Sequence, residues 1–445
     1  MDSAIPSGMR AALSALMERP VTANDKGFGR LAWASPVSAA TLAQTRPSLF
    51  GGDFVFPLMV LRESALASNI AAMASYCAAA GVQLAPHGKT AMAPQLLARQ
   101  LGAGAWGVTA ATTAQVQVYR SFGIPRILIA NEVTDRAAIE WLAAELAADP
   151  GFDCYCFADS LAGVALLDNA LRSSPSWRSA GETTPRLQVL VELGVPGGRA
   201  GCRSVDEAAL VAKAAAAAPA LRLAGAAGYE GCIGHDDSEK TLSAIAAFCR
   251  DLRRLGALLP GLPGGPQEYL LSAGGSGFFD IVVRELTTRP DDAPAATVLL
   301  RSGAYISHDH GYYERVAPGG KSGRHGPALL PGFELWAPVL SRPEPGLAIV
   351  GAGRHDVAFD QDMPIPLGVR PAGGGQADPA DTSAMRVTKL DDQHGYLRVP
   401  DESALAPGDL ICLGISHPCT TFDKWRVIPV IDDQYRVFDA VHTFF

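Results

Sequence analysis

The sequence predicts an α/β protein, a (β/α)8 TIM-type barrel followed by a C-terminal antiparallel β domain. Two observations favour this fold class. From about residue 56 to 305, short apolar strand-like runs alternate with helical ones, as in a parallel sheet covered on both faces. Beyond about residue 320 the runs alternate apolar and polar residues between Pro/Gly turns, which is typical of antiparallel strands. We expect an N-terminal extension at 1–50, the barrel at 51–315 and the β domain at 316–445.

Nine segments of the barrel region have the composition of buried strands: 56–61, 82–87, 105–110, 126–131, 154–159, 187–193, 223–229, 269–274 and 297–302. An eight-stranded barrel needs one fewer, so segment 56–61 could instead join the β domain. A doubly wound open sheet is the alternative fold. No G-x-G-x-x-G follows the first strand, so a dinucleotide-binding version of that sheet lacks its phosphate fingerprint.

Helical segments are expected between these strands. In the first of them Leu66, Ile70, Met73 and Cys77 lie at steps of four, three and four, and Gly81 ends the helix. Others are expected around 90–102, 112–122, 134–148, 205–218 and 237–258. Segments 173–185 and 371–383, rich in Ser, Pro and Gly, are expected to be loops.

Composition limits the class of protein. The chain has 445 residues, 48% of them hydrophobic and 18% charged, which excludes a mainly disordered or fibrous chain. A net charge of -8 argues against a nucleic-acid partner. The start does not resemble a secretory signal, and no run of about 20 apolar residues offers a membrane span. Eight scattered cysteines fit a reducing compartment, so we expect a cytoplasmic protein.

The segment PHGKT carries a candidate catalytic amine. Lys89 follows a predicted strand, beside His87 and Gly88, and so would lie on the catalytic rim of a barrel. Apolar walls would disfavour its charged form and free an amine nucleophile. A lysine that reaches solvent or pairs with a carboxylate is the ordinary alternative.

Two glycine-rich loops follow the last two predicted strands. Gly274, Gly275, Ser276 and Gly277 form the first, and the run Ser302–Tyr305, with Gly303, forms the second. Glycine backbone N–H groups can approach an anion closely, and barrels commonly bind phosphate in their last loops. Tight turns with no ligand are the alternative.

Two histidine-containing pairs could bind a metal. His417 and Cys419 form an H-x-C, and on an extended strand residues i and i+2 share a face, so an imidazole and a thiolate would suit a zinc-like ion. His308 and His310 have the same spacing without a soft ligand nearby. A chance pair is the alternative for both. Arg199, in a glycine-rich loop, could meet an anionic oxygen or be a surface residue.

Together these segments resemble the alanine-racemase-like (fold-type III) pyridoxal-phosphate (PLP) enzymes. Within that family they resemble the D-serine dehydratase and D-threonine aldolase branch, which includes bacterial amino acid deaminases. The motifs that carry the resemblance, over roughly residues 50–445, are PLMVLRESALASNI, PHGKT, VELGVPGGRAG, SAGGSG, LRSGAYISHDHGYY and the terminal SHPC.

The resemblance implies roles for particular residues. Lys89 would be the Schiff-base lysine, and Arg199 would lie near the phenolic oxygen of PLP. His417 and Cys419 would bind a divalent metal, zinc or alternatively manganese. The cofactor-binding residues would further include His87, Thr90, Tyr229, Gly274, Gly275, Ser276, Gly303 and Tyr305. The protein would be a homodimer with active sites shared between subunits.

The resemblance also implies a reaction. The first expectation is an ammonia-lyase (dehydratase) that converts a β-hydroxy D-amino acid, such as D-serine, D-threonine or 3-hydroxyaspartate, into a 2-oxo acid and ammonia. Cys419 favours it, because aldolases of this family use H-x-D. The alternative is a D-threonine-type aldolase, which releases glycine and an aldehyde. A non-catalytic PLP-binding protein is a third hypothesis. The residue pattern assigns no role to Asp360, Asp362 or His394.

Overall fold

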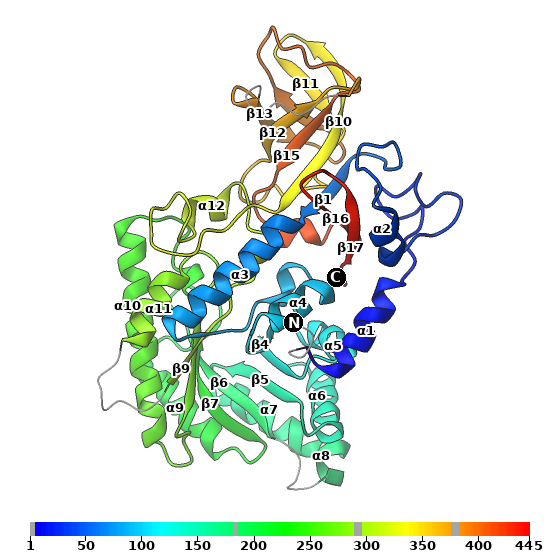
Figure 1. The fold of residues 1–445 in the computed structure, drawn as a ribbon. Coiled ribbons are helices and arrows are strands. Elements are labelled where there is room, and N and C mark those ends of the chain that lie inside the picture. Colours follow the sequence, from blue (N-terminus) through cyan, green and yellow to red (C-terminus); the bar gives the residue numbers. More distant parts are fainter. Residues whose placement is uncertain (1–4, 181–185, 289–295, 375–381) are drawn as a thin grey trace.

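The computed structural model describes residues 5–180, 186–288, 296–374 and 382–445. Within them an eight-stranded parallel sheet curls into a barrel, and a nine-stranded, mostly antiparallel sheet lies beyond one end of it (Figure 1). The predicted fold class is confirmed.

The barrel strands follow one another in chain order around the sheet. They are β2 (Gln83–Leu84), β3 (Val108–Ala110), β4 (Arg126–Glu132), β5 (Asp153–Ala158), β6 (Leu187–Leu193), β7 (Leu221–Gly228), β8 (Tyr269–Ala273) and β9 (Ala296–Leu300). The strand β9 pairs in parallel with β2, and a parallel bridge between His87 and Thr109 joins the ends of β2 and β3. The ring is thereby closed, and β2 and β6 lie on opposite sides of it.

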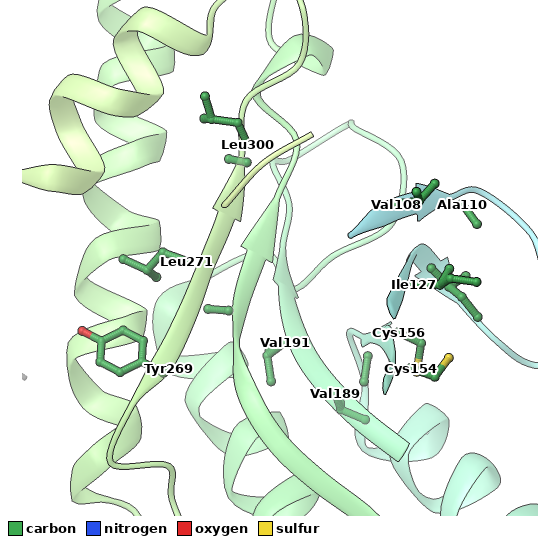
Figure 2. Close-up of a cluster of buried hydrophobic side chains, with 14 of the residues drawn as sticks. Val108, Ala110, Ile127, Cys154, Cys156, Val189, Val191, Tyr269, Leu271 and Leu300 are labelled. Atoms are coloured by element: carbon green, nitrogen blue, oxygen red, sulfur yellow. The ribbon is translucent and has the colours of Figure 1, made fainter. Parts of the chain in front are cut away.

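Successive residues of each strand point in turn to the barrel interior and to the surrounding helices, as the two-residue period of a strand requires. On β6, Val189 and Val191 belong to the large cluster shared with the helices, some of which Figure 2 shows. Leu190, between them, belongs to a small separate cluster that fills the barrel. Cys154 and Cys156 lie in the outer cluster (Figure 2) and pack there as free thiols.

Helices surround the barrel where the periodicity predicts them. The helix α3 (Glu63–Ala80) ends at Gly81, whose φ of 67° is the left-handed conformation that glycine adopts readily. The others are α4 (Pro94–Gly102), α5 (Thr113–Ser121), α6 (Arg136–Ala148), α7 (Leu161–Ser173), α9 (Val205–Ala217), α10 (Glu239–Leu258) and α11 (Phe279–Thr287). Ser, Thr or Asp side chains cap α5, α6, α7, α9 and α10 at their N-termini.

The second sheet takes strands from both ends of the chain. Its strand β1 (Leu58–Arg62) pairs with β10 (Phe333–Glu344) and β16 (Val427–Ile431), so the first predicted strand lies outside the barrel. The remaining strands are β11 (Leu347–Val350), β12 (Ile365–Arg370), β13 (Arg386–Leu390), β14 (Gly395–Arg398), β15 (Leu410–Gly414) and β17 (Val437–His442). The sequence pattern did not predict β12 and β13.

The N-terminal residues pack on both parts of the fold: Met9 belongs to the large barrel cluster, and the residues from Val21 onward pack on the second sheet. The helices α1 (Ser7–Met17) and α2 (Ala39–Thr45) flank a segment whose Phe28 is fully buried, and Leu42 and Leu49 join the same core as β1 and β16. Buried apolar side chains therefore attach this segment to the fold.

Two predicted loops have different outcomes. Part of segment 173–185 is a short helix, α8 (Pro175–Ala180), because Ser174 accepts the N–H of Trp177 and proline suits the first helical position. The rest of that segment, residues 181–185, lies outside the described residues. Most of segment 371–383, residues 375–381, lies outside the described residues. Within the described chain, every helix is too short or too polar to cross a lipid bilayer.

Candidate active site

A cavity of about 520 Å³ opens at the carboxyl ends of the barrel strands, which is where barrel enzymes place their active sites. Both sheets supply residues to it. The barrel contributes His87, Lys89, Thr90, Ala111, Ala130, Asn131, Glu192, Arg199, Ala200, Tyr229, Gly275, Ser276, Arg301, Gly303 and Ala304; the later chain contributes Tyr313, His417, Cys419 and Thr420. Most residues that the sequence singled out therefore meet in one place.

Lys89 lies in a single 3-10 turn (Gly88–Thr90) after β2. A Cβ at Gly88 would lie 2.4 Å from the Tyr119 hydroxyl, so only glycine allows the turn to pack there. Burial lowers the pKa of Lys89, and the charges of Arg199 and Arg301 lower it further, although Cys419 opposes them. The result is an amine inclined to lose its proton, which is what a nucleophile or base requires.

His87 and Thr90 lie on either side of Lys89. Burial, together with the charge of Lys89, holds the pKa of His87 well below its usual range, so its imidazole is neutral. The Nδ1 atom of His87 is buried without a hydrogen-bond partner in the described residues. Thr90 Oγ1 lies 3.3 Å from Cys419 Sγ and so joins the barrel to the second sheet.

The first glycine-rich loop is arranged differently from a simple phosphate cup. The fully buried carboxylate of Glu230 accepts the N–H groups of Gly274 and Gly275, at 3.0 and 2.6 Å. These two N–H groups are therefore already paired within the protein. Ser276 Oγ accepts the N–H of Ala304 and so connects the two glycine-rich loops.

The second glycine-rich loop brings only part of its predicted set to the cavity. A Cβ at Gly303 would lie 2.5 Å from the His87 carbonyl oxygen and 2.7 Å from Thr90 Oγ1, so glycine is needed for this close approach. Tyr305 points elsewhere: it lines a separate cavity, and its hydroxyl accepts a hydrogen bond from Gln100 at 2.9 Å. The 3-10 turn Ala304–Ile306 rotates its side chain away from the Gly303 position.

Arg199 is exposed and lines the cavity. Its guanidinium lies 4.6 Å from the ring centre of Tyr229, within the range of a cation–π contact. The loop that carries it is held by Arg203, which donates to the carbonyl groups of Ala200 and Gly201, and by Asp159, which accepts the N–H of Gly201. Arg199 and Tyr229 are thereby fixed at one wall.

The sequence pattern missed three charged residues at strand ends. Glu192, near the end of β6, and Arg301, after β9, line the cavity, and Glu132, at the end of β4, lies close enough to Glu192 for the two carboxyl groups to influence each other. Burial raises the pKa of Glu132 to about 8. Arg301 is buried and donates to Ser272 Oγ and to the Gly228 carbonyl, both at 2.7 Å. Their position at strand ends on the rim is a signal that sequence reasoning could have used.

His417 and Cys419 both line the cavity, but not from an extended strand as the spacing suggested. Pro418 is helical (φ -58°, ψ -37°) and leads into α13 (Cys419–Phe422), while His417 has a φ of 120°. The turn brings the imidazole and the thiol within hydrogen-bonding reach of each other. Burial lowers the pKa of His417, but the hydrogen bonds with Cys419 and Asp360 outweigh it and raise the pKa to about 9.

Asp360, to which the sequence assigned no role, supports His417. Its Oδ2 lies 2.6 Å from His417 Nδ1, and its Oδ1 accepts a hydrogen bond from Thr420 at 2.8 Å. A carboxylate on one ring nitrogen leaves the other free to bind a metal, the usual support of a ligating histidine. Among the described residues, no group of three or more His, Cys, Asp or Glu side chains forms a metal cluster.

The rival pair, His308 and His310, does not reach the cavity. His308 is buried with its Nε2 3.3 Å from Glu314, and a Cβ at Gly414 would lie 2.6 Å from the His310 ring. Burial lowers the pKa of both rings. These histidines pack inside the protein instead of facing an open site.

Two known domain families match the two parts of this chain separately. The model of the "Alanine racemase, N-terminal domain" matches residues 61–263, and that of the "Putative serine dehydratase domain" matches residues 332–431. A D-threonine aldolase of an Arthrobacter species is 26% identical over 85% of this chain and 89% of its own length. A 3-hydroxy-D-aspartate aldolase of Paracoccus denitrificans is 26% identical over 81% of this chain and 87% of its own.

Solved structures share the whole arrangement. The D-threonine aldolase from Filomicrobium marinum superposes with a TM-score of 0.71 at 26% identity, covering 88% of this chain and 95% of that one. The D-threo-3-hydroxyaspartate dehydratase from a Delftia species, at 22% identity and a TM-score of 0.65 over 88% and 97% of the two chains, has the same fold. Fold, domain matches and relatives agree: residues 61–263 match the alanine racemase N-terminal domain, residues 332–431 match the serine dehydratase domain, and the chain as a whole is similar to D-threonine aldolases in sequence and fold.

Proposed function

We propose that this chain is a lyase that acts on β-hydroxy D-amino acids with PLP and a divalent metal. One observation carries the proposal: a single cavity contains an amine of lowered pKa, Lys89, and an imidazole–thiol pair, His417 and Cys419. The amine suits a carbonyl cofactor, and the imidazole–thiol pair suits zinc. Lys89 follows a barrel strand, whereas His417 and Cys419 lie between two strands of the second sheet.

The residues of the barrel wall fit PLP. Lys89 would bond the aldehyde carbon, and Arg199 with Tyr229 would contact the aromatic ring and its phenolic oxygen. Gly303 leaves room where a Cβ would fill the space beside His87 and Thr90. Because Glu230 already takes the N–H groups of Gly274 and Gly275, we assign the phosphate to Ser276 and the backbone at Gly303 rather than to those two glycines.

The residues of the opposite wall fit a divalent metal. His417 and Cys419 would supply one nitrogen and one sulfur, a donor set that favours zinc over magnesium or calcium. Asp360 would hold the imidazole by its Nδ1 atom. With these two of the described residues as its protein ligands, the metal would keep positions for water and a substrate hydroxyl, as catalytic metal sites do.

When bound, PLP supplies an electron sink for negative charge at Cα, and the metal supplies a Lewis acid for the β-hydroxyl. The chain's own residues perform the remaining tasks. Lys89 Nζ would take the proton from the substrate Cα, for which its lowered pKa suits it. Arg199 supplies positive charge at the barrel wall, and the buried, neutral His87 provides a second group able to accept a proton.

The outcome of the reaction divides into two candidates. A dehydratase expels the β-hydroxyl and yields a 2-oxo acid and ammonia, and Cys419 favours it because the resembling aldolases use H-x-D. An aldolase breaks the Cα–Cβ bond, and two relatives at 26% identity, the D-threonine aldolase and the 3-hydroxy-D-aspartate aldolase, favour it.

Product analysis separates these candidates. Purified protein with PLP and zinc or manganese is incubated with D-serine, D-threonine and D-threo-3-hydroxyaspartate. Ammonia with a 2-oxo acid supports the dehydratase, and glycine with an aldehyde supports the aldolase. Absence of turnover with bound PLP would leave the non-catalytic PLP-binding protein as the correct hypothesis. The homodimer with shared sites stays a prediction, to be checked by light scattering coupled to size-exclusion chromatography.

A further inference from the structure

A lysine of the N-terminal segment reaches two segments of the later chain that adjoin the proposed metal site in sequence. Lys26 lies between α1 and α2, and its Nζ atom donates to the His355 carbonyl at 2.7 Å and to Asp356 Oδ1 at 3.1 Å. The same ammonium group lies 4.7 Å from the ring centre of Trp425, within the range of a cation–π contact. One lysine therefore connects the N-terminal segment to both of these segments.

Asp356 is the buried partner of this lysine. Its side chain is 2% exposed, whereas that of Lys26 is 42% exposed, and among the described residues Lys26 alone forms an ion pair with it. The second carboxylate oxygen, Oδ2, accepts the N–H of Gly353 at 3.0 Å. Removing the cation from a buried pair is strongly destabilising, because the remaining charge is desolvated and uncompensated. The conformation of the turn around Asp356 therefore depends on Lys26.

This turn is bonded to α13, the short helix of the proposed metal site. The Asp356 carbonyl oxygen accepts the indole N–H of Trp425 at 2.8 Å, and Thr421 Oγ1 accepts the N–H of Ala358 at 3.3 Å. Thr421 Oγ1 in turn donates to the His417 carbonyl at 3.2 Å. Trp425, Thr421 and Ala358 are all buried. These hydrogen bonds join the turn to the backbone of a proposed metal ligand.

The turn also leads directly to the carboxylate that supports the ligand. Asp360 follows Ala358 by two residues, and its Oδ2 lies 2.6 Å from His417 Nδ1. His417 has a φ of 120°, a backbone conformation that residues other than glycine rarely adopt, so surrounding contacts must hold it in place. Movement of the turn would therefore disturb both the carboxylate and the backbone that orient the imidazole.

We propose that Lys26 positions the metal site, because it neutralises Asp356 and so fixes the turn that leads to Asp360. The N-terminal segment, which precedes both matched domains, thereby takes part in orienting the His417 imidazole. The inference rests on the proposed metal ligands. Two backbone hydrogen bonds join the same turn to the loop between β13 and β14 without involving Lys26. Replacement of the lysine should therefore loosen the turn and leave the chain folded.

Two measurements test the proposal, and the first needs no metal. In metal-free protein, amide hydrogen exchange is compared between the wild type and Lys26→Ala. Exchange should become at least about tenfold faster in residues 353–360 and 417–425, because these segments open locally, and stay unchanged at the barrel strands. The second measurement is zinc affinity, determined by competition with a chromogenic chelator. It should fall about three- to tenfold, less than the ~10–100-fold expected for a residue that contacts a ligand directly.

Two further variants serve as controls. Lys26→Arg keeps the charge and should retain both the slow exchange and the zinc affinity. Arg46→Ala is matched to Lys26→Ala, because Arg46 also joins the N-terminal segment to the second sheet, through Asp432 at 2.9 Å and the Phe438 ring at 5.6 Å. Among the described residues, Arg46 makes no ion pair or side-chain hydrogen bond with the turn, so this variant should bind zinc as the wild type does.

The outcomes separate this inference from the proposed function. Unchanged exchange and zinc affinity in Lys26→Ala would overturn the inference, as would equal losses in Arg46→Ala. Faster exchange at the barrel strands as well would also overturn it, because Lys26 would then stabilise the whole chain instead of the turn. Failure of the wild-type protein to bind zinc at all would instead overturn the proposed metal site.

Discussion

The two walls of the cavity differ in how the chain builds them. The barrel wall takes residues from the ends of successive strands, so that Lys89, Tyr229 and Gly303 meet because parallel strands end at one rim. The opposite wall joins Asp360 to His417 across 57 positions of the chain, through loops without a repeating pattern. The comparison teaches that site residues at the ends of regular strands can be predicted from sequence. Contacts between loops, in contrast, depend on how distant parts of the chain pack together.

The largest effect is expected from replacing Lys89, which changes the barrel wall and leaves the opposite wall intact. Lys89→Ala should remove the covalent attachment of PLP and lower turnover by at least about 10²–10⁴-fold, since both nucleophile and base are lost. Borohydride reduction followed by peptide mass mapping checks the attachment. Lys89→Arg, which keeps the charge, should fail equally. Loss of metal together with PLP in Lys89→Ala would contradict the independence of the two walls.

The converse experiment replaces His417 or Cys419 in the opposite wall and leaves the barrel wall intact. In His417→Ala and Cys419→Ala, zinc affinity should fall by more than about 100-fold, beyond the effect of losing a supporting residue. Elemental analysis after dialysis measures the metal, and borohydride mapping should still find PLP on Lys89. Removal of the metal from the wild-type protein with a chelator should abolish turnover, and added zinc or manganese should restore it. Full activity in metal-free protein would contradict a metal-dependent reaction.

A smaller effect tests how Asp360 supports the proposed metal ligands. Asp360→Asn should lower zinc affinity by about 10–100-fold, because the imidazole loses the carboxylate that orients its ring. Asp362→Asn is a matched control in the same loop, since Asp362 pairs with Arg315 and Ser416 instead of the histidine. Equal losses in both variants would show that the loop as a whole, rather than the Asp360–His417 contact, determines affinity.

Glu230 offers a structural test within the barrel wall. Glu230→Gln keeps one acceptor oxygen, so one of the two glycine N–H groups loses its partner inside the protein. We expect the free energy of unfolding to fall by about 1–3 kcal/mol, measured by urea denaturation. PLP affinity should fall as well, because the loop beside Ser276 loosens. An increase in PLP affinity would indicate that Glu230 competes with the phosphate.

The smallest expected effect concerns Tyr305, which the sequence placed at the cofactor. Tyr305→Phe removes its hydrogen bond with Gln100 and should cost about 1 kcal/mol of unfolding free energy. Cofactor affinity should not change, because the ring lines a separate cavity. Gln100→Leu serves as the partner variant, and the two costs should not add, since they remove the same hydrogen bond. Weaker PLP binding in Tyr305→Phe would return this residue to the active site.

The local sequence pattern was sufficient to predict the structure where strands and helices alternate regularly. Alternation of apolar runs predicted the barrel strands, the i, i+3, i+4 spacing and Gly81 predicted α3, and the position of Lys89 after a strand predicted its place on the rim. The same reasoning failed for β12 and β13, whose burial is only partial and so leaves no clean alternation. It also failed for Pro418, whose helical turn replaced the expected strand at the metal pair.

The sequence by itself determined the alternation of strands and helices, the β domain after them and the position of Lys89 at a strand end, because each depends on neighbours within a few residues. Tertiary structure alone decided which histidine pair faces the cavity, that Glu230 takes the glycine N–H groups, and that Glu132 meets Glu192. Those contacts join residues distant in the chain, and charge and burial at such places arise only when the sheets close on one another.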